Sequence, residues 1–187
     1  MFVALVPPTE AVEDLDAFLE PRRAAGRDLR WSAPEQLHVT LAFYAAVEER
    51  RLDDLVERLA LAAARRTPFG ARVAGGGAFP DPARARVLWA GLGLAEEAGT
   101  ELERLAAGAR AAASRVGVVV DGQRFRPHLT LARPGRAQEV SRWVRLLDAY
   151  AGPEWTADRV VLVASHLGEG PRRRPRHEVV AELTVGG

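Results

Sequence analysis

The feature that most constrains this chain is a four-residue pattern, His-x-Thr-Leu, which occurs at residues 38–41 and again at residues 128–131. Each copy lies in a run that predicts a β-strand, and each is followed by a predicted helix and then two predicted strands. The copies are too far apart for a solenoid repeat. We therefore expect an internal duplication that gives two pseudo-symmetric lobes, which enclose a central cleft.

The wider pattern predicts an α+β fold in one bilobal domain that spans residues 1–187. Helical apolar spacing predicts helices at residues 9–25, 48–67, 96–116 and 140–150. Apolar and β-branched runs predict strands at residues 2–6, 37–44, 69–73, 85–92, 125–131, 160–165 and 179–185. Residues 75–82, rich in Gly and Pro, predict a turn, and residues 168–176 predict a hairpin tip. Each lobe should be an antiparallel sheet with helices on its outer face.

Composition excludes several classes of chemistry. The chain has no Cys, which removes disulfides, a thiolate nucleophile and sulfur-ligated zinc or iron-sulfur sites. All 26 basic residues are Arg, so a lysyl-adenylate or a Schiff base is impossible. The net charge is only +1, and anion binding must therefore be local. The N-terminal apolar run is short and lacks a charged n-region, so we expect a cytoplasmic protein without membrane contact.

The repeated motif supplies the groups that acid and base catalysis needs. Alternate side chains of a strand point to one face, so His38 and Thr40 project together, as do His128 and Thr130. Histidine can accept or donate a proton near neutral pH, because its unperturbed pKa is about 6.5. Threonine hydroxyls can donate hydrogen bonds to non-bridging phosphate oxygens. Two facing copies therefore predict a site that hydrolyses a phosphodiester without a metal ion.

Around this tandem motif the chain resembles the two-histidine (2H) phosphoesterase superfamily, and within it the RNA 2′,3′-cyclic phosphodiesterases, historically called 2′-5′ RNA ligases. The similarity includes residues 2–5, 30–31, 37–41, 86–89, 125–133 and 165–167. The resemblance implies hydrolysis of RNA or nucleotide 2′,3′-cyclic phosphate ends, tRNA fragments among them, to 2′-phosphomonoesters without a cofactor. It implies His38 as proton donor to the leaving 3′-oxygen and His128 as proton acceptor from water. Thr40 and Thr130 would hold the phosphate.

The chain departs from that family pattern at three places. Residues 43–45 read Phe-Tyr-Ala where the family usually has Phe-Leu-Gly, and Ala42 stands where a lysine is common. His177 precedes Glu178 where the family usually has a tyrosine before the glutamate. These changes leave the catalytic set intact, and they bear on substrate preference.

Two arginines near the second motif are candidates for substrate binding. Arg133 follows His128 by five residues, so regular alternation would place it on the opposite face unless the chain turns at Pro134. We expect it to bind phosphate through its planar guanidinium, with a surface salt bridge as the alternative. Arg126 shares strand parity with His128 and is a second candidate. A basic hairpin tip, either an RNA contact or a solvated loop, is formed by Arg172, Arg173, Arg174 and Arg176.

Other conspicuous residues have plainer interpretations. His166 and His177 lack a Thr two positions later, and we interpret both as structural or surface residues. The four tryptophans could stack on bases, but we expect most of them to lie in the core; they are Trp31, Trp89, Trp143 and Trp155. The acidic pairs at residues 53–54 and 96–97 are typical of solvated helix faces, and no metal site is predicted.

Two alternatives to the hydrolase remain open. The same chemistry in reverse would join tRNA halves through a 2′-5′ bond without ATP, and the sequence does not separate the two directions. A relative that holds a nucleotide without turnover is a binding module; that interpretation would be stronger if either motif had lost its histidine or threonine. We expect the enzyme to act as a monomer.

Overall fold

The computed structural model describes residues 1–122, 124–166, 168–169 and 175–187, and within them it is an α+β fold. The strands are β1 (Phe2–Leu5), β2 (Leu29–Trp31), β3 (Val39–Phe43), β4 (Phe69–Phe79), β5 (Val87–Gly93), β6 (Leu129–Pro134), β7 (Trp155–Ala157), β8 (Arg159–His166) and β9 (Arg176–Thr184). The α-helices are α1 (Thr9–Leu19), α2 (Leu52–Ala64), α3 (Glu96–Arg115) and α4 (Ser141–Asp148). Four short 3-10 helices are η1 (Glu20–Gly26), η2 (Pro34–Gln36), η3 (Glu49–Arg51) and η4 (Pro82–Arg84).

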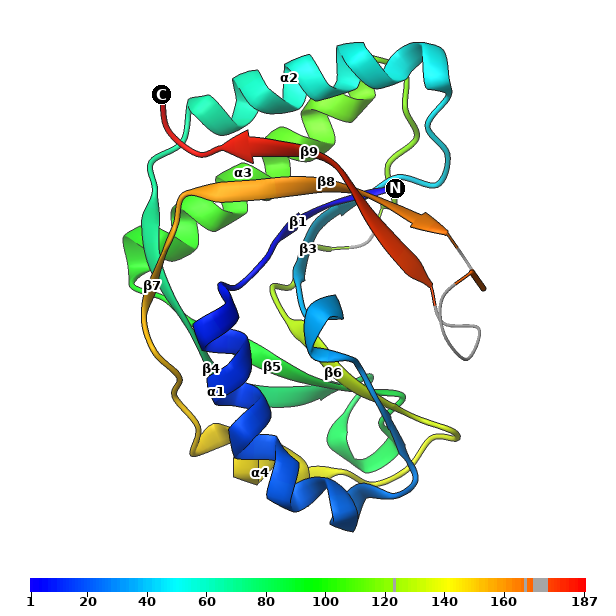
Figure 1. Cartoon of the computed structure of the whole chain (residues 1–187), viewed down its shortest axis with the longest axis vertical. Helices are drawn as coiled ribbons and strands as arrows, with labels where there is room; N and C mark the ends of the chain where they lie inside the picture. The colour runs from blue at the N-terminus through cyan, green and yellow to red at the C-terminus, as the bar shows by residue number, and fades with distance from the viewer. Residues whose placement is uncertain (123, 167, 170–174) are drawn as a thin grey trace.

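The strands form one antiparallel sheet that bends into two walls (Figure 1). Its hydrogen-bonded order is β7-β4-β5-β6-β3-β1-β8-β9, with β2 paired beside β6. We call β1, β3, β8 and β9 with α2 and α3 the first lobe, and β2, β4, β5, β6 and β7 with α1 and α4 the second lobe. Helices cover the outer side of each wall, as the sequence predicts. The expected two sheets are thus two halves of one sheet, joined between β3 and β6.

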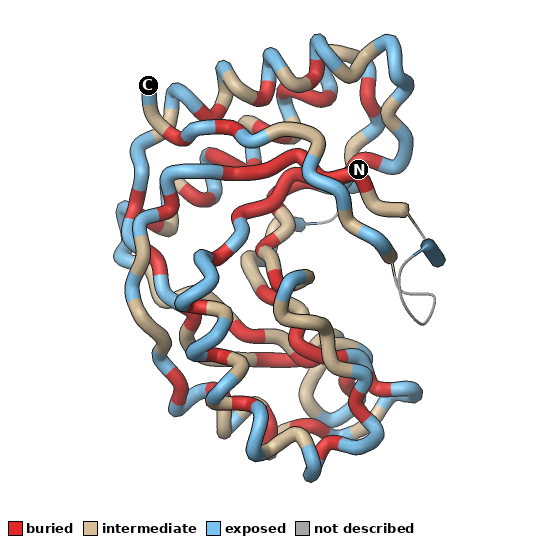
Figure 2. Tube along the Cα trace, in the orientation of Figure 1, coloured by how far each residue is buried: buried red, intermediate tan, exposed pale blue. Residues whose placement is uncertain are grey.

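Each helix is held to its wall by one apolar stripe (Figure 2). In α1 the buried residues are Ala11, Leu15 and Leu19, and in α2 they are Leu55, Leu59 and Ala63, which is the 3.6-residue spacing of a helix face. The alanine-rich α3 packs against both α2 and β3. Tyr44 follows β3 in this core and is fully buried, and its hydroxyl donates a hydrogen bond of 3.0 Å to the carbonyl of Ala109. Burial of the polar tip is compensated by that bond.

The sequence repeat does not correspond to one lobe. After the first motif, β3 and α2 stay in the first lobe, but β4 and β5 cross into the second. After the second motif, β6, α4 and β7 stay in the second lobe, and β8 returns to the first. Both lobes therefore contain chain from both repeats, so the simple duplication of one lobe is wrong although the two-walled architecture is right.

The boundaries of several elements differ from the prediction. The turn expected at residues 75–82 is wrong for its first half, because β4 continues through Gly76 and Gly77 to Phe79. Large side chains explain this: Leu147 lies against the position of a Cβ on Gly76, and Trp89 lies against that on Gly77. The sixth strand begins at Leu129 rather than at residue 125. None of the described helices is long and apolar enough to cross a membrane.

Candidate active site

The two motifs meet where the two halves of the sheet join. Val39 of β3 pairs with Leu129 of β6 in antiparallel register, and both side chains are fully buried. An antiparallel register around this pair brings His38 opposite Thr130 and His128 opposite Thr40. Because alternate side chains point the other way, all four functional side chains face the cleft. A local two-fold relation between the strands thus explains why the sequence needs the motif twice.

A matching irregularity follows each motif. The β1–β3 pairing steps from Val3–Ala42 to Ala4–Thr40, which leaves Leu41 as an extra residue in β3. The β5–β6 pairing steps in the same way past Leu131. An extra residue of this kind is a β-bulge, and it reverses the alternation beyond it. The residue five positions after each histidine is therefore turned back to the cleft.

Those two residues are Phe43 and Arg133. Both line the same cavity as the motif side chains, and both are exposed. A regular strand would place Arg133 on the opposite face, but the bulge at Leu131, rather than a turn at Pro134, brings it to the cavity. Its contact with phosphate stays a prediction. The local symmetry places an aromatic ring on one side of the site and a guanidinium on the other.

Each histidine ring is fixed by one hydrogen bond to the backbone. The Nδ1 atom of His38 lies 2.7 Å from the carbonyl oxygen of Gln36, and Nδ1 of His128 lies 2.7 Å from that of Arg126. A carbonyl oxygen only accepts, so Nδ1 carries the proton in both rings. The other ring nitrogen, Nε2, is then the position that exchanges a proton with a ligand. The two histidines have the same tautomer for the same structural reason.

The motif side chains line one cavity of about 340 Å³ between the lobes. Ser32 belongs to its wall and is held there because its hydroxyl donates to the carbonyl of Thr130 at 2.8 Å. The full lining is Phe2, Ser32, Gln36, His38, Thr40, Phe43, His128, Thr130, Arg133, Ser165, Pro175 and His177. A cavity of this size suits a small ligand, and its donors suit an anion.

Burial keeps the two motif histidines neutral in the free protein. Desolvation lowers the pKa of His38 to about 4, opposed by its bond to Gln36 and reinforced by the nearby rings of His177 and His128. Desolvation also lowers the pKa of His128, and the guanidinium of Arg133 lowers it further. A phosphate anion in the cavity reverses this effect, since an opposite charge favours the imidazolium form. The site is therefore set to take up a proton when an anion binds.

The sequence matches the family model described as LigT like Phosphoesterase over residues 6–89 and 92–172. The chain belongs to the LigT-like phosphoesterase family. A curated relative from Geobacillus stearothermophilus, named RNA 2′,3′-cyclic phosphodiesterase, is 28% identical over 188 residues, which cover 100% of this chain and 57% of the relative. The chain thus spans little more than half of that protein. A relative of the same name from Thermus thermophilus is 35% identical over 160 residues, covering 82% of this chain and 74% of the relative.

Solved structures show the same fold. The crystal structure of TT0787 of Thermus thermophilus matches with a TM-score of 0.77 at 29% identity, covering 100% of this chain and 97% of that one. The apo structure of E. coli LigT matches with a TM-score of 0.76 at 23% identity, covering 100% and 96% of the two chains. The two-walled architecture of this LigT-like phosphoesterase is therefore that of its structural relatives.

His177 is a cavity residue that the sequence analysis assigned to a structural or surface role. Its ring lies edge-on to the rings of His38 and Phe2, with centroid distances of 5.5 and 5.2 Å. Phe2 in turn stacks on His38 at 4.7 Å. In β9, His177 pairs with Ser165 of β8, and both line the cavity. The available signal was the departure from the tyrosine that usually precedes the glutamate in the family, which singled out the position of His177 in the sequence.

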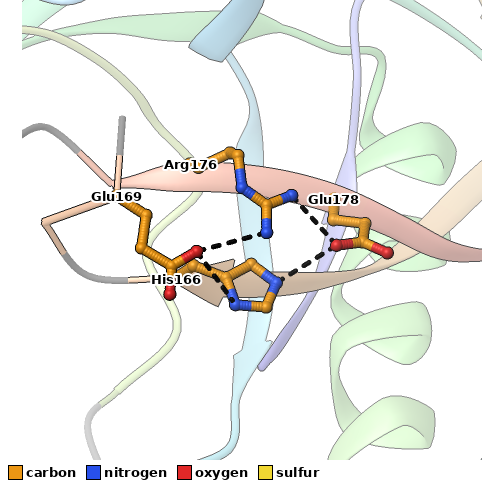
Figure 3. Close-up of polar contacts among 4 residues, drawn as sticks. All are labelled: His166, Glu169, Arg176 and Glu178. Atoms are coloured by element: carbon orange, nitrogen blue, oxygen red, sulfur yellow. Dashed lines mark hydrogen bonds and ion pairs between the residues drawn. The ribbon is translucent and has the colours of Figure 1, made fainter. Parts of the chain in front are cut away.

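His166 and Arg176 follow and precede the cavity residues Ser165 and His177, so they lie on the other face of the β8–β9 hairpin. Figure 3 shows them there with Glu169 and Glu178. Arg176 pairs with Glu178 at 3.0 Å and with Glu169 at 3.2 Å, and Nε2 of His166 lies 3.2 Å from Glu178. The carboxylates of Glu169 and Glu178 thus lie beside both Arg176 and His166, which matches the structural interpretation of His166. Among the arginines of the basic hairpin tip, Arg176 forms ion pairs with Glu169 and Glu178. The other three, at residues 172–174, lie outside the described residues.

The remaining candidates are divided between core and site. The Arg126 side chain lines a neighbouring cavity instead of the one between the histidines. Trp143 is buried and packs edge-on against Trp31, whereas Trp89 lies beside the ring of the motif histidine His128, with 6.1 Å between the ring centroids. Within the described part of the chain no group of three or more His, Asp or Glu side chains is placed to hold a metal ion.

Proposed function

We propose that this LigT-like phosphoesterase hydrolyses 2′,3′-cyclic phosphate ends of RNA or nucleotides to 2′-phosphomonoesters by two-histidine acid and base catalysis that needs no metal ion. The observation that supports it most directly is the pair of rings in one cavity, each with Nδ1 tied to a carbonyl and Nε2 left for proton transfer. The name shared by the curated relatives supports the same substrate class. The cytoplasmic location and the monomeric state expected from the sequence stay predictions.

In this mechanism the substrate anion binds first and raises the pKa of His38, which becomes protonated at Nε2. His128, neutral at Nε2, takes a proton from the attacking water, and His38 gives its proton to the departing 3′-oxygen. The hydroxyls of Thr40 and Thr130 and the guanidinium of Arg133 hold the non-bridging oxygens while charge develops. The local two-fold symmetry makes the two rings geometrically equivalent, so geometry does not assign the roles of acid and base. We assign them from the family resemblance.

The test is turnover of a nucleoside 2′,3′-cyclic phosphate, followed by phosphorus NMR of the product. We expect a 2′-monoester, and a 3′-monoester would reverse which ribose oxygen leaves. Replacement of His38 or His128 by Gln should lower kcat by about 10² to 10⁴, because each variant loses one proton-transfer group. Gln also keeps a hydrogen-bonding side chain, so folding should be preserved. Full activity in the double variant, or loss of wild-type activity in EDTA, would contradict the proposal.

A further inference from the structure

A second cavity adjoins the catalytic one and shares three of its residues. Its volume is about 610 Å³, and it shares Thr40, Phe43 and His128 with the cavity between the histidines. The two cavities adjoin each other along these three residues. A ligand whose reacting phosphate lies between His38 and His128 can therefore extend into the larger cavity. The larger cavity has the size of a site for a whole nucleotide.

The larger cavity has more positive than negative side chains. Arg110 of α3 and the exposed Arg124 and Arg126 line it, against one carboxylate, that of Asp121. The side chains of Arg124 and Arg126 form no hydrogen bond or ion pair within the described residues, in contrast to the paired Arg176. Solvent-facing guanidinium groups without a carboxylate partner are suited to bind phosphate.

The same cavity also has flat surfaces for a base. Phe43, turned inward by the bulge at Leu41, is 44% exposed although it is aromatic. On the other wall the guanidinium of Arg126 lies over the ring of Phe79, with 5.9 Å between its carbon and the ring centroid. Phe79 is in turn fixed edge-on to His128 at 4.9 Å. Bases of single-stranded RNA stack on aromatic rings and on arginine planes of this kind.

The position of the charges indicates which part of an RNA chain fits here. In a nucleotide that ends in a 2′,3′-cyclic phosphate, the base and ribose are neutral, and the next anion is the phosphate on the 5′-oxygen. Arginines in the adjoining cavity therefore have no partner in the terminal nucleoside itself. We propose that this cavity binds two groups: the phosphate on the 5′-oxygen of the terminal nucleoside, and the base of the nucleotide that precedes it. The inference rests on the proposed function and extends it from the chemistry to the length of the substrate.

The test compares three substrates, each of which adds one group to the last. They are a nucleoside 2′,3′-cyclic phosphate, the same compound with a 5′-phosphate, and a dinucleotide that ends in the cyclic phosphate. For the wild type we expect kcat/KM to rise at both steps, by roughly tenfold for the stacked base. The advantage of the two longer substrates should shrink as salt rises, since a phosphate–arginine contact releases counterions.

Variants assign each step to its residue. Arg124→Gln should lower the gain from the 5′-phosphate, and Phe43→Leu should lower the gain from the second base. Arg126→Gln should lower both gains, because it removes a charge and the guanidinium plane that lies over Phe79. Arg65→Gln is the matched control: Arg65 is exposed at the end of α2 on the outer side of the first lobe, so the same loss of charge there should leave both gains unchanged. All four positions are exposed, and thermal unfolding will confirm that each variant folds.

The two proposals fail in different ways. If the nucleoside cyclic phosphate is hydrolysed but the longer substrates gain nothing, the second cavity does not bind RNA and the proposed function stands. The same conclusion follows if the arginine variants reduce turnover of all three substrates equally. If the wild type hydrolyses none of the three, the proposed function itself is wrong.

Discussion

His177 lies close enough to His38 for the charge on one ring to affect the pKa of the other. When both rings are protonated they repel, and this repulsion contributes to the low pKa of His38, about 4. His177→Gln should therefore raise the pKa of His38, by on the order of one pH unit. The four histidines of the chain make this measurable by NMR titration of the ring protons in the free protein.

His166→Gln provides the control for that titration, because His166 lies on the other face of the hairpin among Glu169 and Glu178. The His166→Gln replacement should leave the pKa of His38 unchanged. The limb of the pH profile of kcat/KM that reports the pKa of His38 should move to higher pH in His177→Gln and stay in place in His166→Gln. Equal midpoints for His38 in both variants and the wild type would show that His177 is only a wall of the cavity.

The four motif residues could be found from the sequence because strand alternation is a local rule. His38 and Thr40 share a face wherever β3 lies, and the same holds for His128 and Thr130. The sequence alone could not show that Phe43 and Arg133 point into the cavity. The orientation of each side chain depends on one extra residue in a strand pairing. His177 was missed for a related reason: its neighbour His38 is distant in sequence, and only the pairing of β8 with β9 beside β1 brings the rings together.

The glycines of β4 show the same limit at the scale of an element. Gly and Pro at residues 75–82 predict a turn from local propensity. The strand continues instead because neighbouring elements need the space: Leu147 of α4 lies against Gly76, and Trp89 of β5 lies against Gly77. A residue without a side chain in a strand can mark a close approach as well as a turn, and only the packed structure distinguishes the two.

Gly77→Ala should therefore disturb the active site from a distance. The new Cβ would overlap the indole ring of Trp89, which packs against Phe79 and lies beside His128. We expect a loss of about 1–3 kcal/mol in the free energy of unfolding, as for overpacked cores, together with a lower kcat as His128 is displaced. Urea denaturation and turnover of a cyclic phosphate measure the two effects.

Gly70→Ala is the matched control within the same strand, since no atom lies within 4 Å of the position that a Cβ would take there. Its free energy of unfolding should change by less than about 0.5 kcal/mol. If both variants behave alike, the close approach of Trp89 does not constrain the strand.

At the scale of the whole molecule, one nearly symmetric sheet junction produces an asymmetric site. The pairing of Val39 with Leu129 relates the two motifs, and both rings are anchored to a carbonyl two residues upstream. The surroundings then differ: His38 is flanked by Phe2 and His177, whereas His128 is flanked by Phe79, Trp89 and the charge of Arg133. The shared geometry suits proton transfer in either direction, and the unequal neighbours give each histidine its own pKa.

This arrangement has a cost in stability that depends on pH. The folded protein holds His38 neutral down to a pKa of about 4, whereas the unfolded chain has the ordinary value of about 6.5. Between these values the unfolded state binds a proton that the folded state does not, so the free energy of unfolding falls as pH falls below 6.5. For His38 alone the loss between pH 7 and pH 5 is about 2 kcal/mol. Burial lowers the pKa of His128 and His177 as well, and both add to the loss.

Urea denaturation at pH 7, 6 and 5 measures this loss of unfolding free energy. The series ends at pH 5 so that protonation of carboxylates does not contribute to the change. Glu101, Glu139 and Glu178 have lowered pKa values in the folded state, so their contributions are complete above about 4.5 and disappear only at lower pH. The variant with Gln at positions 38, 128 and 177 should lose most of the slope between pH 7 and pH 5. Sulfate, which remains a dianion over this range, should stabilise the wild type more at pH 5 than at pH 7, because it binds the protonated rings. A wild type as stable at pH 5 as at pH 7 would mean that the cavity does not hold its histidines neutral.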